Sequence, residues 1–113
     1  MNADQYQKSA GRTLISKPDA NYTDNEIMMV WNAIGLTGEA GEVADNIKKG
    51  VFHQHGVDRD KLVKELGDVL WYVAALCTTL GVSLSDVMEQ NITKLLKRYP
   101  NGYNSDDSIN RSD

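Results

Sequence analysis

The chain has 113 residues, the length of one domain with little room for a self-contained cleft, so we expect oligomerisation to complete its functional site. A formal net charge of −4 and a pI near 5.1 exclude the broad basic surface typical of nucleic-acid binding. The sequence has no run of 18 apolar residues and no charged-then-apolar start, so we expect neither a membrane partner nor secretion.

Four helices are predicted in succession, and no segment alternates convincingly with the period of a strand. The first is expected from Ala3 to Leu14, and Pro18 then interrupts the pattern because proline disfavours helix in the residue before it. The second opens with a capping box of Thr23 and Glu26 and closes at Gly50. The expected architecture is all-α and similar to a four-helix bundle.

The second helix contains three glycines, Gly35, Gly38 and Gly41. Each destabilises a helix interior by about 1 kcal/mol relative to alanine. Either the helix breaks near residues 36–37, or the glycines allow another backbone or a ligand to come close. We favour close approach, because Glu39 and Glu42 lie among these glycines.

The third helix is expected to begin after Asp58 or Asp60 and to end at Gly81. The fourth is expected from Ser83 to Pro100. Residues 1–100 would thus form one helical domain. Residues 101–113 contain few apolar side chains, so we expect a polar, flexible tail that buries too little surface to order itself.

Two short carboxylate pairs are the most informative feature of the sequence. Glu39 and Glu42 lie on the second predicted helix, Glu65 and Asp68 lie on the third, and residues three apart share a helix face. Packed antiparallel, the two helices would bring four carboxylates together, and cations would be needed to offset their repulsion. A hard divalent ion such as Mg²⁺ suits an all-oxygen site. The pattern therefore predicts metal-assisted chemistry on phosphates.

Other polar side chains border the apolar faces of the third and fourth helices. Asp68 and Tyr72 extend the flank that holds Glu65, where clefts between helices form. On the fourth helix, a stripe beside the apolar face offers an amide and two cations: Asn91, Lys94 and Arg98. Cations next to metal-binding carboxylates predict a polyphosphate ligand.

Each feature also has a purely structural interpretation. A single carboxylate pair is more often part of a solvated helix face, and only the two pairs together favour a site. Lys94 and Arg98, taken alone, are explained by their position near a helix C-terminus. Tyr72 fits interhelical packing as well as ligand contact. Trp31 and Trp71 are expected in packing or in an oligomer interface.

The histidines and the cysteine point to no further chemistry. His53 and His55 alternate in a loop and lack the helical spacing of zinc ligands. Cys77, the single cysteine, lies in an apolar pattern typical of a helical core. A reducing cytoplasm is therefore the expected compartment.

Read in order, three segments resemble the MazG-like, all-α nucleoside triphosphate pyrophosphohydrolases: GLTGEAGEVADNIKKG, KELGDVLWYVAAL and GVSLSDVMEQNITKLLKRYPNGY. The resemblance spans residues 6–103 and includes both carboxylate pairs and a closing N-x-x-K-x-x-x-R-Y-P pattern. Each motif alone is weak, but together and in this order they are specific. One departure is Gly38, where many relatives carry a further glutamate, and it leaves the number of metal ions and the general base open.

The resemblance implies hydrolysis of a nucleoside triphosphate, NTP or dNTP, to the monophosphate and pyrophosphate in nucleotide-pool housekeeping. It implies Mg²⁺, or alternatively Mn²⁺, held by four carboxylates: Glu39, Glu42, Glu65 and Asp68. It places Tyr72, Asn91, Lys94 and Arg98 near the nucleotide, and it implies a homodimer or homotetramer. Within this scheme we assign catalysis to Glu39 and Glu42, with Glu39 preferred for orienting or deprotonating the attacking water.

Two other functions remain open from the sequence. The chain would also fit a non-catalytic helical module that binds a nucleotide or a protein partner. A carboxylate-bridged di-iron bundle ranks last, because the usual Glu-x-x-His pairs are missing. The preferred base and sugar cannot be inferred from one chain.

Overall fold

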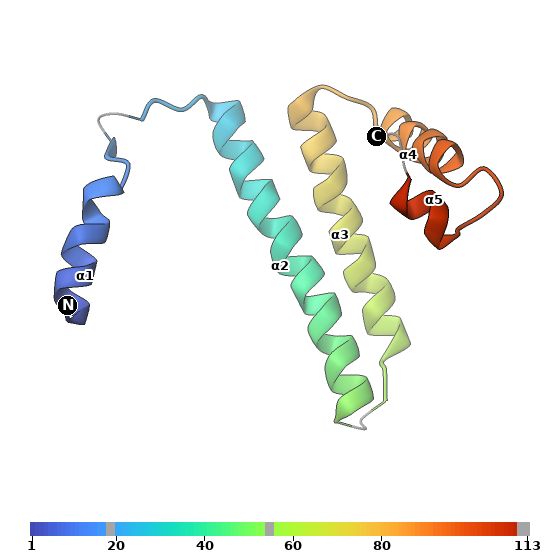
Figure 1. The fold of residues 1–113 in the computed structure, drawn as a ribbon, viewed down its shortest axis with the longest axis horizontal. Coiled ribbons are helices and arrows are strands. Elements are labelled where there is room, and N and C mark those ends of the chain that lie inside the picture. The colour runs from blue at the N-terminus through green and yellow to red at the C-terminus, as the bar shows by residue number, and fades with distance from the viewer. Residues whose placement is uncertain (18–19, 54–55, 111–113) are drawn as a thin grey trace.

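The structure is a computed structural model that describes residues 1–17, 20–53 and 56–110. Its elements are listed in chain order: α1 (Ala3–Ala10), the 3₁₀ turn η1 (Gly11–Thr13), α2 (Asp24–Phe52), α3 (Arg59–Leu80), α4 (Leu84–Arg98) and α5 (Ser105–Ile109). Figure 1 shows α2 and α3 side by side, with α1 and α4 on opposite sides of them. Within the described ranges there is no strand beyond an isolated bridge of Pro100 and Gly102. The predicted all-α class is confirmed.

Local capping explains where the helices begin. Thr23 accepts a hydrogen bond from the Glu26 N–H, and the Glu26 side chain accepts one from the Thr23 N–H. This is the predicted capping box of α2. Asp58 and Ser83 cap α3 and α4 without a reciprocal bond: each side chain accepts one hydrogen bond from a backbone N–H of the first turn. Gly81, at a φ of 72°, ends α3 as predicted.

Two helix ends differ from the prediction. The first helix stops at Ala10 and continues as the η1 turn, where the Thr13 hydroxyl donates to the Ala10 carbonyl at 3.1 Å. The second continues past Gly50 to Phe52. A Cβ on Gly50 would lie 2.8 Å from the Gly56 carbonyl oxygen, so this glycine permits a close return of the chain within the helix. The predicted break at Pro18 and the loop residue His55 lie outside the described residues.

α2 is continuous through its three central glycines, so the alternative of a break near residues 36–37 is wrong. At Gly35 the close neighbour is a side chain, and not the backbone or ligand that was predicted: a Cβ there would overlap the ring of Tyr72 from α3. Cβ atoms on Gly38 and Gly41 would meet nothing within 4 Å. Only one of the three glycines is therefore required for packing of α2 against α3.

The helices of a single chain are loosely packed and do not gather around one core. α2 and α3 form an antiparallel hairpin, and α4 leaves α3 at a bend of 104° (Figure 1). The radius of gyration is 20.4 Å, against about 13 Å for a globular chain of this length. Cys77 is the one buried apolar side chain among the described residues, as its pattern predicted. One chain supplies the helices of a bundle without packing all of them together.

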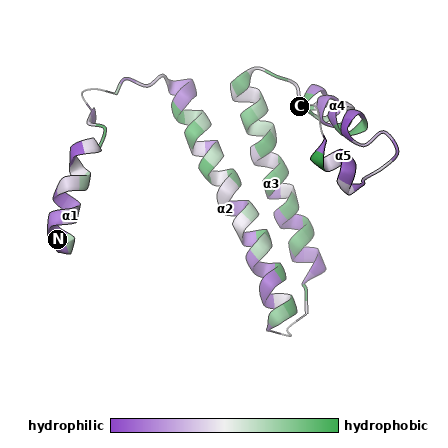
Figure 2. Cartoon of the chain, viewed as in Figure 1, coloured by the Kyte–Doolittle hydropathy of each residue, from purple (hydrophilic) through white to green (hydrophobic). Residues whose placement is uncertain are grey.

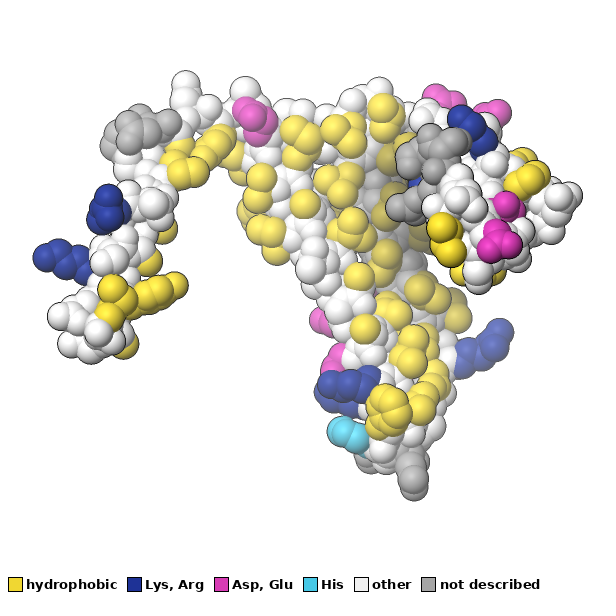
Figure 3. Space-filling view, in the orientation of Figure 1, with side chains coloured by type: hydrophobic (Ala, Val, Ile, Leu, Met, Phe, Trp, Pro, Cys, Tyr) yellow, Lys and Arg dark blue, Asp and Glu magenta, His cyan; other side chains and the backbone are white. Residues whose placement is uncertain are grey.

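Large apolar side chains remain exposed along the hairpin and on α4. Figure 2 shows hydrophobic residues on much of α2 and α3, and Figure 3 shows hydrophobic side chains spread over the visible face of the hairpin. Trp31 is 68% exposed and Leu96 is 62% exposed. No single helix of the described residues is long and apolar enough to cross a membrane, although α3 and α4 together pass the same length and composition test.

The described part of the C-terminal segment contains a short helix, α5, which was not predicted. α5 forms within the expected tail because Asn104 caps it, accepting a hydrogen bond from the Asp107 N–H at 2.7 Å. The rings of Tyr99 and Tyr103 pack 5.2 Å apart between α4 and α5. The polar composition of the segment does not reveal this local cap. The division at residue 100 stays a prediction.

Candidate active site

The middle of the α2–α3 hairpin holds the predicted carboxylates. Two contacts set the register of the helices: Asn46 of α2 bonds Glu65 of α3, and Gly35 of α2 lies against Tyr72 of α3. Between these contacts lie Glu39 and Glu42 on one helix and Asp68 on the other: the structure brings both pairs to one stretch of the hairpin.

Glu39 is influenced by the charges of all three other carboxylates. It is half-buried, and its Oε2 atom is buried without a hydrogen-bond partner among the described residues. Burial raises the pKa of Glu39. The pKa is raised further by the negative charges of Glu42 and Asp68, by a hydrogen bond with Glu42 and by the charge of Glu65. This is the electrostatic signature expected where several carboxylates share one site.

An open cavity of about 370 Å³ adjoins the carboxylates and is lined by Glu39, Asp68, Trp71 and Tyr72. The two aromatic rings meet edge to face, with centroids 5.0 Å apart and an interplanar angle of 85°. The side chain predicted to contact substrate, Tyr72, therefore lines the same cavity as two carboxylates. Trp71 had been assigned to packing or an interface. Its spacing of three residues from Asp68 was the signal that could have placed it here.

Glu65 is the most enclosed of the four carboxylates, with 8% of its surface exposed. Asn46 Nδ2 donates to its Oε1 at 2.6 Å and to its Oε2 at 2.7 Å. Asn46 is not among the residues predicted for the site. The available signal was its spacing of seven residues from Glu39, which places both on the face of α2 that packs on α3.

The donor set fits a hard divalent cation in its chemistry. Four carboxylates offer only oxygen ligands, and the buried Glu39 oxygen lacks a partner that a cation would supply. Glu42 and Asp68 are exposed. No three Asp, Glu, His or Cys side chains of the described residues are gathered closely enough to hold an ion as they stand. The site therefore has the right ligands but is not preassembled.

The predicted substrate-binding residues of α4 lie elsewhere in the chain. Lys94 and Arg98 line a separate cavity of about 530 Å³ on α4, while Asn91 is exposed and does not line it. About 18 Å of helix separates Asp68 from the end of α3, and about 15 Å separates the start of α4 from Lys94. With the 104° bend, Lys94 lies on the order of 20 Å from the carboxylates along these axes. One chain does not bring the two groups together.

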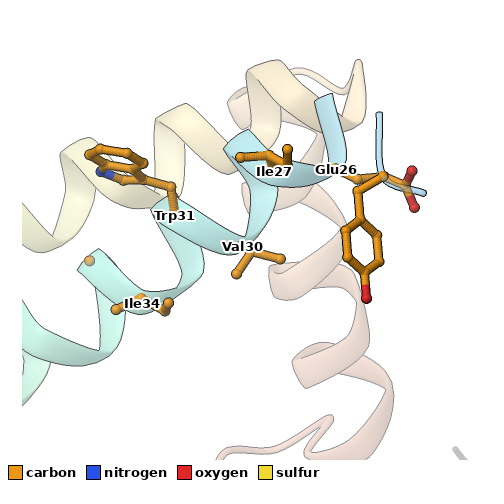
Figure 4. A pocket seen from close by; sticks show the side chains of 7 residues that line it. Glu26, Ile27, Val30, Trp31 and Ile34 are labelled. Atoms are coloured by element: carbon orange, nitrogen blue, oxygen red, sulfur yellow. The ribbon is translucent and has the colours of Figure 1, made fainter. Parts of the chain in front are cut away.

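A further cavity is an apolar groove on the N-terminal half of α2. It has a volume of about 700 Å³ and is lined by Tyr22, Glu26, Ile27, Val30, Trp31, Ile34 and Gly35. Figure 4 shows the apolar side chains of α2 in a row along the helix, with Glu26 at one end. Glu26 is the sole acidic group in this lining and already caps α2. The groove therefore matches a packing surface better than a phosphate site.

Comparison with known proteins covers both the hairpin and α4. Residues 32–103 match the family model of the MazG nucleotide pyrophosphohydrolase domain. The matched range includes both carboxylate pairs and α4. The chain is 42% identical to the Gene 37 protein of Mycobacterium phage L5 over 106 residues, covering 90% of this chain and 92% of that protein. It is 36% identical to the Bacillus subtilis (strain 168) protein named Uncharacterized protein YvdC over 76 residues, covering 57% and 69%. No solved structure matches it significantly. The chain thus belongs to the MazG nucleotide pyrophosphohydrolase family.

Proposed function

We propose that the protein hydrolyses a nucleoside triphosphate, NTP or dNTP, between the α and β phosphates, and that it acts in cytoplasmic nucleotide-pool housekeeping. The products would be the monophosphate and pyrophosphate. Membership of a nucleotide pyrophosphohydrolase family supports the reaction class. The observation that carries the proposal is the shared location of Glu39, Asp68 and Tyr72 on one cavity of the α2–α3 hairpin.

Four residues would hold Mg²⁺, with Mn²⁺ as the alternative: Glu39, Glu42, Glu65 and Asp68. When bound, such an ion lowers the pKa of a coordinated water and offsets negative charge on the phosphoryl group. The orphaned Glu39 oxygen and the all-oxygen donor set support this assignment.

Glu39 is the preferred group to orient or deprotonate the attacking water, with Glu42 as the alternative. A general base works best when its pKa is close to the working pH, and the pKa of Glu39 is raised towards that range. Tyr72 and Trp71 would contact the nucleotide from the wall of the cavity, which their rings line beside two carboxylates.

Oligomerisation is part of the proposal, because a single chain leaves too much surface open. The accessible surface is 9612 Å², about 3,400 Å² more than a compact monomer of this mass exposes. Burying about half of this excess on each chain would already give an obligate homodimer interface. We propose a homodimer or homotetramer in which α4 of one copy brings Asn91, Lys94 and Arg98 to the carboxylates of another, where the cations would offset charge on the leaving pyrophosphate.

The test is product analysis with purified protein. Individual NTPs and dNTPs are incubated with Mg²⁺, and the products are separated by chromatography. We expect monophosphate and pyrophosphate in equal amounts. Inorganic phosphate as the first product would contradict the proposed cleavage position.

A non-catalytic nucleotide-binding or protein-interaction module is the second candidate. It is favoured by one observation: the described acidic side chains are not gathered into a ready metal site. Calorimetry separates the two functions. The enzyme should bind Mg²⁺ more tightly when a nonhydrolysable nucleotide is present, whereas an interaction module need not.

A further inference from the structure

Asn46 holds the buried carboxylate of Glu65 from the opposite helix. Its Nδ2 atom lies at nearly equal distances from the two carboxylate oxygens, 2.6 and 2.7 Å. The nitrogen is therefore centred between the oxygens, on the edge that a carboxylate would use to chelate an ion through both of them. Hydrogen bonds to an ionised acceptor are stronger than those between neutral groups, so this contact fixes the orientation of Glu65.

An amide suits this position better than a cation if Glu65 binds a metal. Each carboxylate oxygen can accept two hydrogen bonds or ligands. The contact from Asn46 uses the inner side of both oxygens and leaves their outer sides available. Because the amide is neutral, it adds no positive charge that would compete with a metal cation for Glu65. A lysine or arginine here would fix the carboxylate equally well but would neutralise it.

We propose that Asn46 is a positioning residue that orients Glu65 for divalent-cation binding and thereby sets the affinity of the site for Mg²⁺ or Mn²⁺. The inference rests on the proposed function, because it takes Glu65 as a metal ligand. Hydrogen-bonding partners of metal ligands typically contribute 10- to 100-fold to metal affinity.

The competing explanation is that Asn46 merely links α2 to α3, and the chain offers a matched control. Asn25 also lies on α2 and donates through its Nδ2 to the Thr79 carbonyl of α3 at 2.9 Å. Both asparagines join the same two helices, but Asn25 lies at the other end of the hairpin, away from the carboxylates. Asn25→Ala therefore removes an interhelical hydrogen bond without changing the neighbours of Glu65.

The experiment measures Mn²⁺ affinity by electron paramagnetic resonance on the full chain, with thermal unfolding measured in parallel. We expect Asn46→Ala to weaken Mn²⁺ binding by about 10- to 100-fold. Asn46→Leu, which keeps side-chain bulk but removes the donor, should weaken it equally. Asn46→Gln, which keeps the amide, should recover part of the loss. Asn25→Ala should lower the melting temperature and leave the affinity unchanged.

Several results would overturn the inference. Unchanged or tighter Mn²⁺ binding by Asn46→Ala would make Asn46 a bystander or a competitor for Glu65. Equal affinities of the Asn46→Leu and Asn46→Gln variants would exclude a role for the amide, and this pair decides the matter if Asn46→Ala does not fold. A wild-type chain that binds no Mn²⁺ would overturn the proposed metal site as well, which distinguishes failure of the function from failure of this inference alone.

Discussion

The ring of Tyr72 on α3 occupies the space that a side chain on Gly35 of α2 would need. Glu39 lies one helical turn beyond Gly35. The contact therefore sets the separation of the two helices next to the carboxylates, and it holds Tyr72 at the cavity that Glu39 and Asp68 also line. The absence of a side chain at Gly35 therefore allows the close packing of α2 against α3 and, with it, the position of Tyr72 beside the carboxylates.

Gly35→Ala should destabilise the protein and reduce its activity. Alanine is favoured over glycine in a helix by about 1 kcal/mol, but overpacking of this kind typically destabilises by about 1–3 kcal/mol. Denaturant unfolding should therefore show a net loss of stability. Gly38→Ala is the control, because its Cβ meets nothing within 4 Å in the chain, and it should be neutral or stabilising. A Gly35→Ala variant as stable as Gly38→Ala would mean that the Tyr72 ring moves aside freely.

Glu42→Ala and Glu65→Ala should each abolish turnover while α2 and α3 stay folded. Removing a metal ligand removes both the charge and the oxygen that hold the ion, whereas alanine is the best helix former. Circular dichroism and product analysis would check the two expectations together. Asp60→Ala, at an exposed position in the first turn of α3, should keep full activity. Retained activity in both glutamate variants would contradict the metal assignment.

Glu39→Gln should stabilise the metal-free protein at neutral pH while it removes activity. The pKa of Glu39 is raised from its ordinary value of 4.5, so the folded chain binds this proton more tightly than the unfolded chain. Its contribution to stability is fully present below pH 4.5 and is lost as the pH rises through the raised pKa. The wild-type melting temperature in EDTA should therefore fall between about pH 5 and 8 more steeply than that of Glu39→Gln.

Two other acidic groups must be kept out of that measurement. The pKa of Glu26 is lowered by its hydrogen bonds to Thr23, and that of Asp45 by its hydrogen bond with Lys49. Their contributions are lost only as the pH falls below their ordinary values. A scan that starts at pH 5 therefore leaves out Glu26 and Asp45, and the difference between wild type and Glu39→Gln reports on Glu39. If the melting temperatures of wild type and Glu39→Gln change with pH in parallel, a raised pKa of Glu39 is contradicted.

Much of the fold could be predicted because its signals are local. The capping pair of Thr23 and Glu26 fixes the start of α2, and Gly81 fixes the end of α3. The spacing within each carboxylate pair places its members on one helix face. α5 is also capped locally, by Asn104, although the polar composition of the segment predicts no helix.

The remaining features depend on contacts between distant residues. The pairing of Asn46 with Glu65 follows from the register of α2 against α3, which the close return of the chain at Gly50 helps to fix. Hydrophobic periodicity reports which face of a helix is buried, not its register against a neighbour. The 104° bend after α3 cannot be predicted from the sequence either. Gly81 marks the end of a helix but does not specify the direction of the next one.

The separation of Lys94 from the carboxylates leads to a complementation test. Lys94→Ala and Glu42→Ala should each be inactive alone, because each removes one part of a site that two copies build together. In a mixture that exchanges subunits, half of the dimers are mixed, and each mixed dimer has one intact site. Activity should therefore return to about a quarter of the wild-type value. If the site were formed within one chain, every site would carry a defect and no activity would return. Light scattering at the expected multiple of the 12.6 kDa chain mass should accompany the assay, because only oligomers that exchange subunits can produce the recovery.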